Sequence, residues 1–496
     1  MIASRIPLLL AGACIALAAP AVAQRHEHGG SIAAEQVAPG QAFARGLHLL
    51  HNFEYDRAQA AFQQARAADP GNVMAAWGEA MAVNHPLWMQ VDVEAGRAAL
   101  ARLGTTPAAR RAKAKTDKQR MWLDAVEALY AGSTKIARDQ AYNRAMEAMF
   151  VRFPDDVDVR SFTALSIMGL AHNGREIPLY MRAAAMLEEV YPANLTHPGV
   201  LHYLIHAYDD PDHAPLGLRA ARRYSAVAPD AGHAMHMTSH IYLALGQWPD
   251  VERANVLALD IVNRQRAAGG KPATSCGHYA EWLVYALLQQ GRDPRTKVDA
   301  CRRQGEAAIG AAPGAGGPSP VASWADMAAR VAVETGVVPQ PLPMLDGRFL
   351  MPRFWLAYAR MIADGPAAQR IAAQQELASL GAPMLAGLAA NQPDDKSTPR
   401  WIERALAQGE ALKALAEGKD EQGLRMLRVA ADAEGGLPVE FGPPALPKPS
   451  IELVADTLLA GGRKAEAAVA YRATLAIAPG RRRALAGLQS SLAVTP

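Results

Sequence analysis

The chain has 496 residues, a formal net charge of +3, and half of its residues are hydrophobic. This near balance of charge argues against nucleic acid as a partner, because a nucleic-acid-binding protein needs a concentrated basic face. No run after residue 23 approaches the twenty apolar residues of a membrane-spanning helix. The sequence therefore predicts no transmembrane segment after that point.

Residues 1–23 have the pattern of a secretory signal peptide. Arg5 gives a positive start, residues 6–19 form an apolar core, and an Ala-Val-Ala tripeptide at 21–23 is typical of a cleavage site. We therefore expect an exported protein, either periplasmic or extracellular.

Two cysteines, Cys276 and Cys301, follow the predicted signal peptide. An oxidising compartment permits a disulfide between them. Two unpaired buried thiols are the alternative, and the sequence does not decide between the two.

Segments of helical length, separated by Pro, Gly, Asn or Asp, follow one another along the chain. Strand signals are absent, since no sustained alternation of Val, Ile and Thr occurs. The sequence therefore predicts an all-α fold. The predicted helices are Lys113–Tyr130, Ala137–Phe153, Thr163–His172, Ile177–Tyr191, Pro198–Asp209, Ala214–Val227, His233–Leu245, Val251–Arg266, Tyr279–Gln290, Pro399–Glu417, Glu421–Ala433 and Arg481–Ala493.

Small and large residues recur at fixed places in 34-residue units. With Pro70 set at position 32 of such a unit, Gly46, Ala58, Phe62 and Ala65 take positions 8, 20, 24 and 27. In this pattern the small residues let two helices approach, and the aromatic ring fills the gap beside them. The chain thus resembles the tetratricopeptide (TPR) family.

Near the C-terminus Gly462, Ala467, Tyr471 and Pro479 repeat this pattern. The resemblance implies a helical solenoid, a right-handed superhelix of helix pairs. We expect a TPR solenoid at 39–290, a less regular helical region with Gly/Pro-rich connectors at 291–434, and a last repeat with a capping helix at 448–494. The blocks HPGVLHYLIHAYDDPDHAPLGLRAARRY, SHIYLALGQW and NHPLW also resemble a group of exported bacterial TPR proteins, a likeness that bears on fold more than on function.

Seven of the fourteen histidines lie between residues 196 and 248. His202 and His206 are four residues apart, and so are His236 and His240, so each pair shares one face of a helix. The second pair follows the first by 34 residues, so both pairs take the same repeat positions. The resemblance to the TPR family implies that these positions line the concave groove of the solenoid. These four imidazoles are the predicted ligands of a divalent transition metal (Zn, Cu or Fe).

Other residues are candidates for the same groove. His172, His233 and His278 are possible additional ligands, and His51 and His85, again 34 residues apart, are predicted to line the groove. Three carboxylates, Asp209, Asp210 and Glu79, are candidate bases, and either aspartate could instead bind the metal or orient a ligating ring. His197 and His213 fall at loop or cap positions, which favours a structural role.

No nucleophile elbow, phosphate loop, dinucleotide fingerprint or HExxH motif occurs. Whether the protein is an enzyme stays open, and metal-assisted chemistry is the reaction type that fits these residues best. The alternative function is a scaffold whose groove binds a peptide or partner protein without metal.

Overall fold

The computed structural model describes residues 39–132, 134–309, 319–340, 342, 349–363, 365–391 and 396–493. The predicted signal peptide lies outside these residues, as do parts of the Gly/Pro-rich connectors. Over the described residues the predicted all-α class is confirmed, with 23 α-helices, two short 3₁₀ helices and one pair of two-residue strands. Each of these helices is too short or too polar to cross a lipid bilayer.

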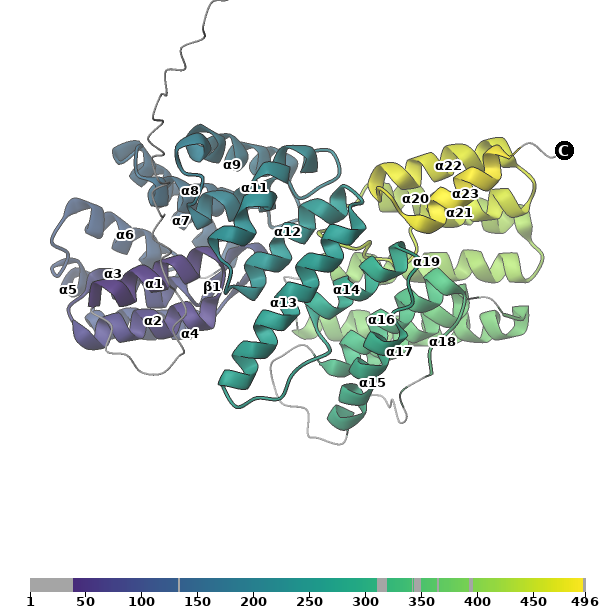
Figure 1. Ribbon diagram of the computed structural model, residues 1–496, viewed down its shortest axis with the longest axis horizontal. Helices are drawn as coiled ribbons and strands as arrows, with labels where there is room; N and C mark the ends of the chain where they lie inside the picture. The colour runs from purple at the N-terminus through teal and green to yellow at the C-terminus, as the bar shows by residue number, and fades with distance from the viewer. Residues whose placement is uncertain are drawn as a thin grey trace, which may run out of the picture. The chain divides into compact units, whose positions relative to one another are not determined.

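The first part of the chain holds seven helices and the two strands (Figure 1). The helices are α1 (Pro39–His51), α2 (Tyr55–Ala68), α3 (Val73–Met81), α4 (Val93–Leu103), α5 (Pro107–Arg111), α6 (Asp117–Ala128) and α7 (Lys135–Arg152). Strands β1 (Asn84–His85) and β2 (Gln90–Val91) pair antiparallel on either side of the 3₁₀ helix η1 (Pro86–Trp88).

The histidine-rich part follows as a second run of helices. These are α8 (Val157–Met168), α9 (Ile177–Val190), the 3₁₀ helix η2 (Tyr191–Ala193), α10 (Pro198–Ala207), α11 (Ala214–Val227), α12 (Gly232–Ala244), α13 (Trp248–Ala268) and α14 (His278–Gln289). Along this run consecutive helices pack against each other, and α10 also packs directly against α12.

The remaining helices are α15 (Arg295–Ile309), α16 (Pro320–Thr335), α17 (Leu350–Ile362), α18 (Ala367–Asn391), α19 (Thr398–Ala416), α20 (Asp420–Gly435), α21 (Ser450–Ala460), α22 (Lys464–Ile477) and α23 (Arg482–Leu492). Residues 291–434, expected to be less regular, thus contain α15 to α19 and most of α20. The segment that precedes α14 is tied to α15 by a disulfide between Cys276 and Cys301, whose Cα atoms are 4.9 Å apart.

The ring of Phe62 and the small residues around it pack closely where α1, α2 and α3 meet. The ring of Phe62 is fully buried between α1 and α3, and a methyl group added at Gly46 or Gly78 would come within 2.7 Å or 2.4 Å of it. Ala58 and Ala65 on the same helix are also fully buried. A small residue is therefore needed wherever a neighbouring helix meets this ring.

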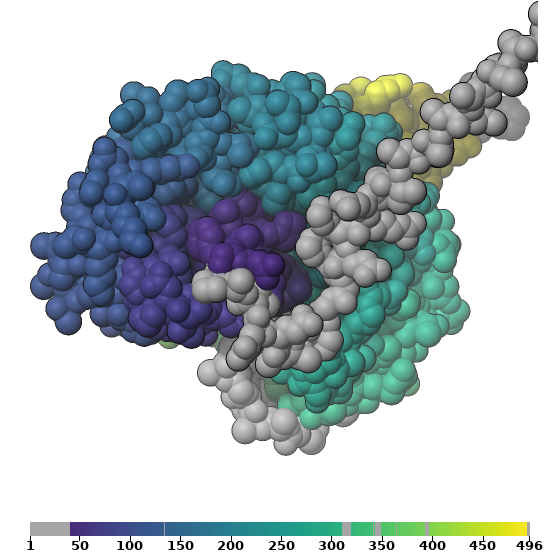
Figure 2. Space-filling view, turned by 60° about the vertical axis from the view of Figure 1, so that its left-hand side comes forward, coloured from purple at the N-terminus to yellow at the C-terminus, as the bar shows by residue number. Residues whose placement is uncertain are grey.

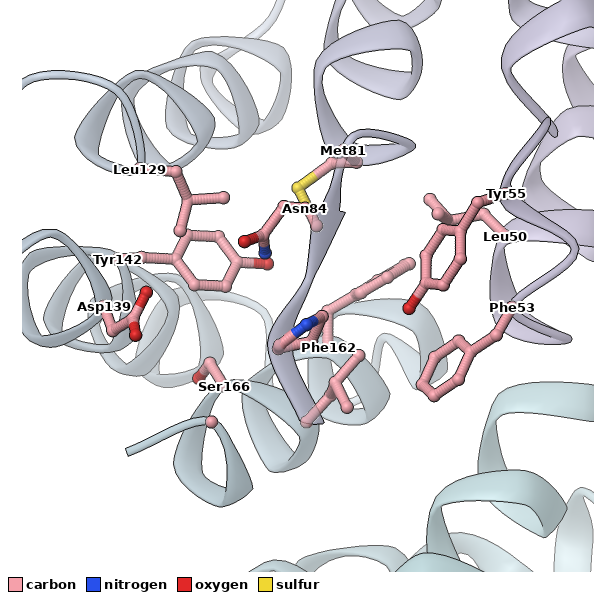
Figure 3. Close-up of a pocket in the computed structure, with 13 residues that line it drawn as sticks. Leu50, Phe53, Tyr55, Met81, Asn84, Leu129, Asp139, Tyr142, Phe162 and Ser166 are labelled. Atoms are coloured by element: carbon pink, nitrogen blue, oxygen red, sulfur yellow. The ribbon is translucent and has the colours of Figure 1, made fainter. Parts of the chain in front are cut away.

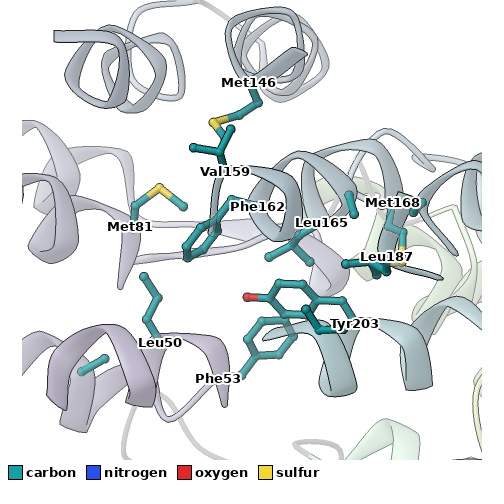
Figure 4. Close-up of a cluster of buried hydrophobic side chains, with 14 of the residues drawn as sticks. Leu50, Phe53, Met81, Met146, Val159, Phe162, Leu165, Met168, Leu187 and Tyr203 are labelled. Atoms are coloured by element: carbon teal, nitrogen blue, oxygen red, sulfur yellow. The ribbon is translucent and has the colours of Figure 1, made fainter. Parts of the chain in front are cut away.

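The largest hydrophobic core runs through α1 to α12 (Figure 4). Phe53, Phe162 and Tyr203 lie together in it, although they come from distant parts of the sequence. The core therefore joins the start of the described chain to the histidine-bearing helices.

The turn between α1 and α2 packs against α10 to α12. The Tyr224 hydroxyl donates to Asn52 Oδ1 at 2.7 Å, and the His233 backbone N–H lies 3.4 Å from Glu54 Oε1. Figure 2 shows the purple N-terminal segment lying against the blue and teal one. In a simple solenoid each repeat contacts only its neighbours, so this contact departs from the open groove expected from sequence.

Candidate metal centre

Six histidines from three helices line one continuous site. His202 and His206 lie on α10, and His278 is the first residue of α14. The other three, His233, His236 and His240, lie on α12. On α12 the positions His233, His236 and His240 are three and four residues apart, so all three face the same side of the helix. The two predicted pairs and two of the three predicted additions therefore come together in space.

The six divide into two groups. The first, His202, His206 and His233, has one ring nitrogen from each residue within 4.8 Å of the other two. Its ring centroids lie 4.8, 5.1 and 6.5 Å apart. Imidazoles that share one ion at bonds of about 2.0–2.1 Å have centroids roughly 5 Å apart. This group could therefore hold a metal ion.

The Nε2 atoms of these three histidines are buried and have no hydrogen-bond partner among the residues that the structure describes. A buried polar atom without a partner is costly, and native proteins rarely leave one unexplained. The same three residues offer ring nitrogens close enough to one another to bind a single transition-metal ion.

The second group consists of His236, His240 and His278, again with donor atoms within 4.8 Å of one another. The His236 ring centroid lies 4.9 Å from that of His240 and 4.5 Å from that of His278. His236 and His240 are almost fully buried, whereas His278 is exposed. This group could also hold an ion, and it is open to solvent on the His278 side.

Hydrogen bonds at Nδ1 fix which nitrogen is free to bind a metal. His202 Nδ1 lies 2.6 Å from the His51 carbonyl oxygen, and His240 Nδ1 lies 2.5 Å from Asp209 Oδ2. Because both partners only accept, each Nδ1 carries the proton and each Nε2 keeps its lone pair. This is the outer-shell arrangement found around metal-bound histidines.

His236 is fixed in the same way by Asn255. Its Nδ1 lies 2.7 Å from Asn255 Oδ1. The Asn255 amide nitrogen donates to Ser239 Oγ at 3.1 Å and to the Val251 carbonyl at 2.8 Å, which determines the orientation of the amide. His236 Nε2 therefore also keeps its lone pair.

Burial favours the neutral form of four of the six imidazoles, those of His202, His206, His233 and His236. Desolvation lowers the pKa of His202 to about 3. Desolvation, assisted by the neighbouring histidines, lowers the pKa of His206, His233 and His236 well below the usual value. The neutral imidazole is the form that binds metal, so the site is ready for an ion at neutral pH.

The three candidate bases have different surroundings. Asp209 is buried and orients His240. Asp210 instead pairs with Arg175 at 2.7 Å, and the same guanidinium donates to the carbonyls at the end of α10. Asp210 therefore helps to hold the end of the helix that carries His202 and His206, which corrects its assignment as a base or ligand.

Glu79 lies in a separate place, on α3. It is fully buried between Arg66 and Arg102, and Arg102 donates to it at 2.6 Å. Both carboxylate oxygens are thus engaged by arginines. Glu79 holds these side chains together and is not placed to act as a base at the histidine groups.

His172 lies outside the histidine groups. The helix predicted at Thr163–His172 is α8, which begins earlier because Asp156 accepts hydrogen bonds from the first backbone N–H groups, and which ends at Met168. His172 therefore follows the helix, and its Nε2 lies 2.8 Å from Asp139. The predicted additional ligand is a hydrogen-bond partner of Asp139 instead.

His51 belongs to a third group, with Asp158 and His197. The Val200 backbone N–H donates to His197 Nδ1, so the proton of His197 is on Nε2, which lies 3.0 Å from Asp158. His51 Nε2 contacts the same carboxylate at 2.9 Å, and His51 Nδ1 lies 3.0 Å from the Tyr203 hydroxyl. Every ring nitrogen of this group has a protein partner, so the group is complete without a metal.

His85 lies on the strand β1 and is half-buried. Its ring stacks on Tyr55 with the centroids 3.9 Å apart. Trp88, which is 45% exposed, contacts Phe53, Tyr55 and His233. His85 is thus part of an aromatic wall beside the first group and does not reach its ligand atoms.

Phe53 separates the first histidine group from a small cavity. Its ring lies 4.3 Å from that of His202, and its backbone has φ 55°, an unusual conformation for a residue other than glycine. The cavity has a volume of about 20 Å³ (Figure 3). The polar side chains of Tyr55, Asn84 and Tyr142 line it (Figure 3), and their oxygens have no partner among the described residues.

Sequence reasoning missed Phe53 and Asn255. Asn255 lies on α13, within a helix in which no sequence motif marks it, and Phe53 is 149 residues before His202. Comparison of the sequence with protein-family models found no matching family, and comparison with curated proteins found no match. Function is therefore argued from the site itself.

Proposed function

We propose that this is an exported TPR protein that binds a divalent transition metal, Zn, Cu or Fe, through its histidine groups. His202, His206 and His233 hold an ion in one group, and His236, His240 and His278 provide the ligands of the other. All six ligands are imidazoles, which suit zinc, copper and iron better than magnesium or calcium.

One observation carries this proposal. The buried Nε2 atoms of His202, His206 and His233 have no hydrogen-bond partner among the described residues, and the same three histidines offer ring nitrogens within 4.8 Å of one another. The group formed by His51, Asp158 and His197 provides an internal comparison, because all its ring nitrogens have protein partners. The ring nitrogens of that group are thus satisfied by protein groups, whereas the Nε2 atoms of His202, His206 and His233 are left for an ion.

Two further features support export and the TPR architecture. A disulfide, such as that between Cys276 and Cys301, persists in oxidising compartments outside the cytosol. Successive helices pack in sequence order, with Gly46 and Phe62 in the contact that the TPR pattern prescribes. Export can be tested by fractionating cells that express the full chain.

The proposal is tested by measuring metal in protein purified without a histidine tag. We expect bound zinc, copper or iron in the wild type, and none after His206 and His240 are both replaced by alanine. The helical circular dichroism signal of the double variant should stay near that of the wild type. Equal metal content in the two proteins would contradict the proposal, and a metal-free wild type that copurifies with a peptide would favour the scaffold function.

A further inference from the structure

We propose that the two histidine groups bind two ions at the same time and form one dinuclear centre, with α12 supplying ligands to both. This inference rests on the proposed function, because it requires that the histidines bind metal. It adds three properties to that function: how many ions are bound, how close together they lie, and which kind of ligand they share.

The ligands on α12 divide between the two ions. His233, in the first turn, points to the group on α10, whereas His236 and His240 join His278 of α14. Each group thus has the same composition: two histidines four residues apart on one helix, and a third from the first turn of the helix two further along the chain. The same site is therefore built twice by consecutive repeats.

The two groups are adjacent. The His206 and His240 ring centroids are 6.2 Å apart, and those of His233 and His236 are 6.4 Å apart. In both pairs the two rings belong to different groups. The ions are therefore separated by no more than the usual distance between packed helices, about 8–10 Å.

Each ion would have three protein nitrogens, which leaves at least one coordination position open. Structural zinc sites are closed by four protein ligands, whereas catalytic sites have three and a water molecule. Exposed His278 and the exposed ring of Trp88, which contacts His233, mark the side from which a small molecule can enter. The open positions indicate ions that act on a ligand.

The balance of charge identifies the ligand class. Two divalent ions add four positive charges, and the carboxylates that contact the histidine groups are Asp209, at His240, and Glu54, at the His233 backbone. Asp210 is already neutralised by Arg175. Counted over the described residues, the loaded centre therefore keeps a net positive charge and attracts a small anion or an oxygen donor such as hydroxide.

The test counts copper in untagged protein after loading with Cu²⁺ and removal of the excess. We expect two ions per chain in the wild type and one per chain in each of the variants His233→Ala and His278→Ala, which remove one ligand from one group each. His172→Ala is the matched control, since His172 pairs with Asp139 outside the groups, and it should retain two ions.

The number of copper ions bound per chain of the wild type distinguishes three outcomes. No bound copper would contradict the proposed function as well as this inference. One ion per chain would overturn the dinuclear centre and leave metal binding intact. Two ions that both persist in His233→Ala and in His278→Ala would place copper elsewhere and overturn the assignment of ligands.

Electron paramagnetic resonance tests whether the ions are close. The wild-type Cu²⁺ spectrum should be broadened or weakened by coupling between the ions, and the single-ion variants should give a narrow spectrum of full intensity. Azide, a small anion, should change the visible absorption of the wild type by binding at an open position. A narrow wild-type spectrum with two coppers, or no response to azide, would overturn the inference.

Discussion

The Nε2 atoms of His236 and His240 face each other at 3.0 Å. Both rings have their Nδ1 proton directed at an acceptor, Asn255 for one and Asp209 for the other. The two Nε2 atoms therefore point at the same place, where the proposed ion would accept a lone pair from each. Imidazole nitrogens bound to one ion at about 2.0–2.1 Å lie at a similar separation.

Asp209 should raise the metal affinity of the second group without binding the metal itself. Replacement of Asp209 by Asn removes the charge that orients His240 and favours its metal-binding tautomer. Loss of such an outer partner weakens metal affinity about 10–100-fold. Titration with a competing chelator measures this change. Asp212→Asn, an exposed substitution in the same loop, should leave the affinity unchanged, and equal affinities in the two variants would exclude the role of Asp209.

His197 should matter for stability and not for metal. His197→Ala removes the N-cap of α10 and a partner of Asp158, and loss of an N-cap costs about 0.5–2 kcal/mol. Urea denaturation should show this loss, while His197→Asn, which can cap the helix, should recover part of it. Metal content should be the same in all three proteins, and loss of an ion from His197→Ala would assign a metal to the third group.

The metal-free protein should become less stable as the pH falls below about 6.5. Burial lowers the pKa of His202 to about 3 in the folded protein, whereas in the unfolded chain the pKa stays near 6.5. Between these values the unfolded chain binds a proton that the folded one excludes, so the free energy of unfolding decreases by up to about 1.4 kcal/mol per pH unit for each such histidine.

Denaturation between pH 7 and pH 5 measures this dependence. The free energy of unfolding should depend less steeply on pH in His202→Gln. This variant lacks one titrating group, so unfolding takes up about one proton fewer. A stability that does not change from pH 7 to pH 5 would contradict the neutral, buried state of these histidines.

The sequence allowed the helices and the two histidine pairs to be predicted better than their surroundings. The spacing of His202, His206, His236 and His240 places each pair on one helix face, a relation set by the local helical geometry alone. The sequence predicted one site of four ligands, whereas the structure brings together two groups of three. This difference arises because the first turns of α12 and α14 also face the site, which depends on how neighbouring helices pack.

The predicted open groove differs from the structure for a related reason. Phe53 lies over His202 because the turn after α1 packs against α10 and α12. Contacts between residues so far apart in the chain leave no periodic pattern in a sequence. In the same way, α8 ends at Met168 with Gly169 as its C-cap, so His172 follows the helix. Glu79 looks available in sequence because the arginines that pair with it lie 13 and 23 residues away.

Gly442 should be required for the packing beside the second group. This residue has φ 97°, and a methyl group added to it would lie 2.3 Å from Trp282, whose ring contacts His236 and His240. Gly442→Ala should therefore cost about 1–2 kcal/mol for the backbone and about 1–3 kcal/mol more for overpacking.

Gly418→Ala provides the matched control for this substitution. Gly418 has φ 77° and no atom within 4 Å of an added methyl group, so its replacement should show the backbone cost alone. In thermal denaturation the melting temperature should be highest for the wild type, lower for Gly418→Ala and lowest for Gly442→Ala. Equal melting temperatures for the two variants would show that the Trp282 side chain moves aside without a cost in stability.

Reduction of the disulfide should lower stability. Cys276 and Cys301 are 25 residues apart, and closure of a loop of this size stabilises a fold by about 3 kcal/mol in the chain-entropy model. Replacement of both cysteines by serine should lower the urea midpoint by a corresponding amount. An unchanged midpoint would show that α14 and α15 are held in place without the bridge.

Anomalous X-ray scattering from crystals of the untagged, metal-loaded protein, measured at the absorption edge of the bound metal, would locate the ions directly. We expect two anomalous peaks, one at the Nε2 atoms of His202, His206 and His233 and one within reach of His236, His240 and His278. Crystals of loaded protein without an anomalous peak at either histidine group would contradict the proposed metal binding.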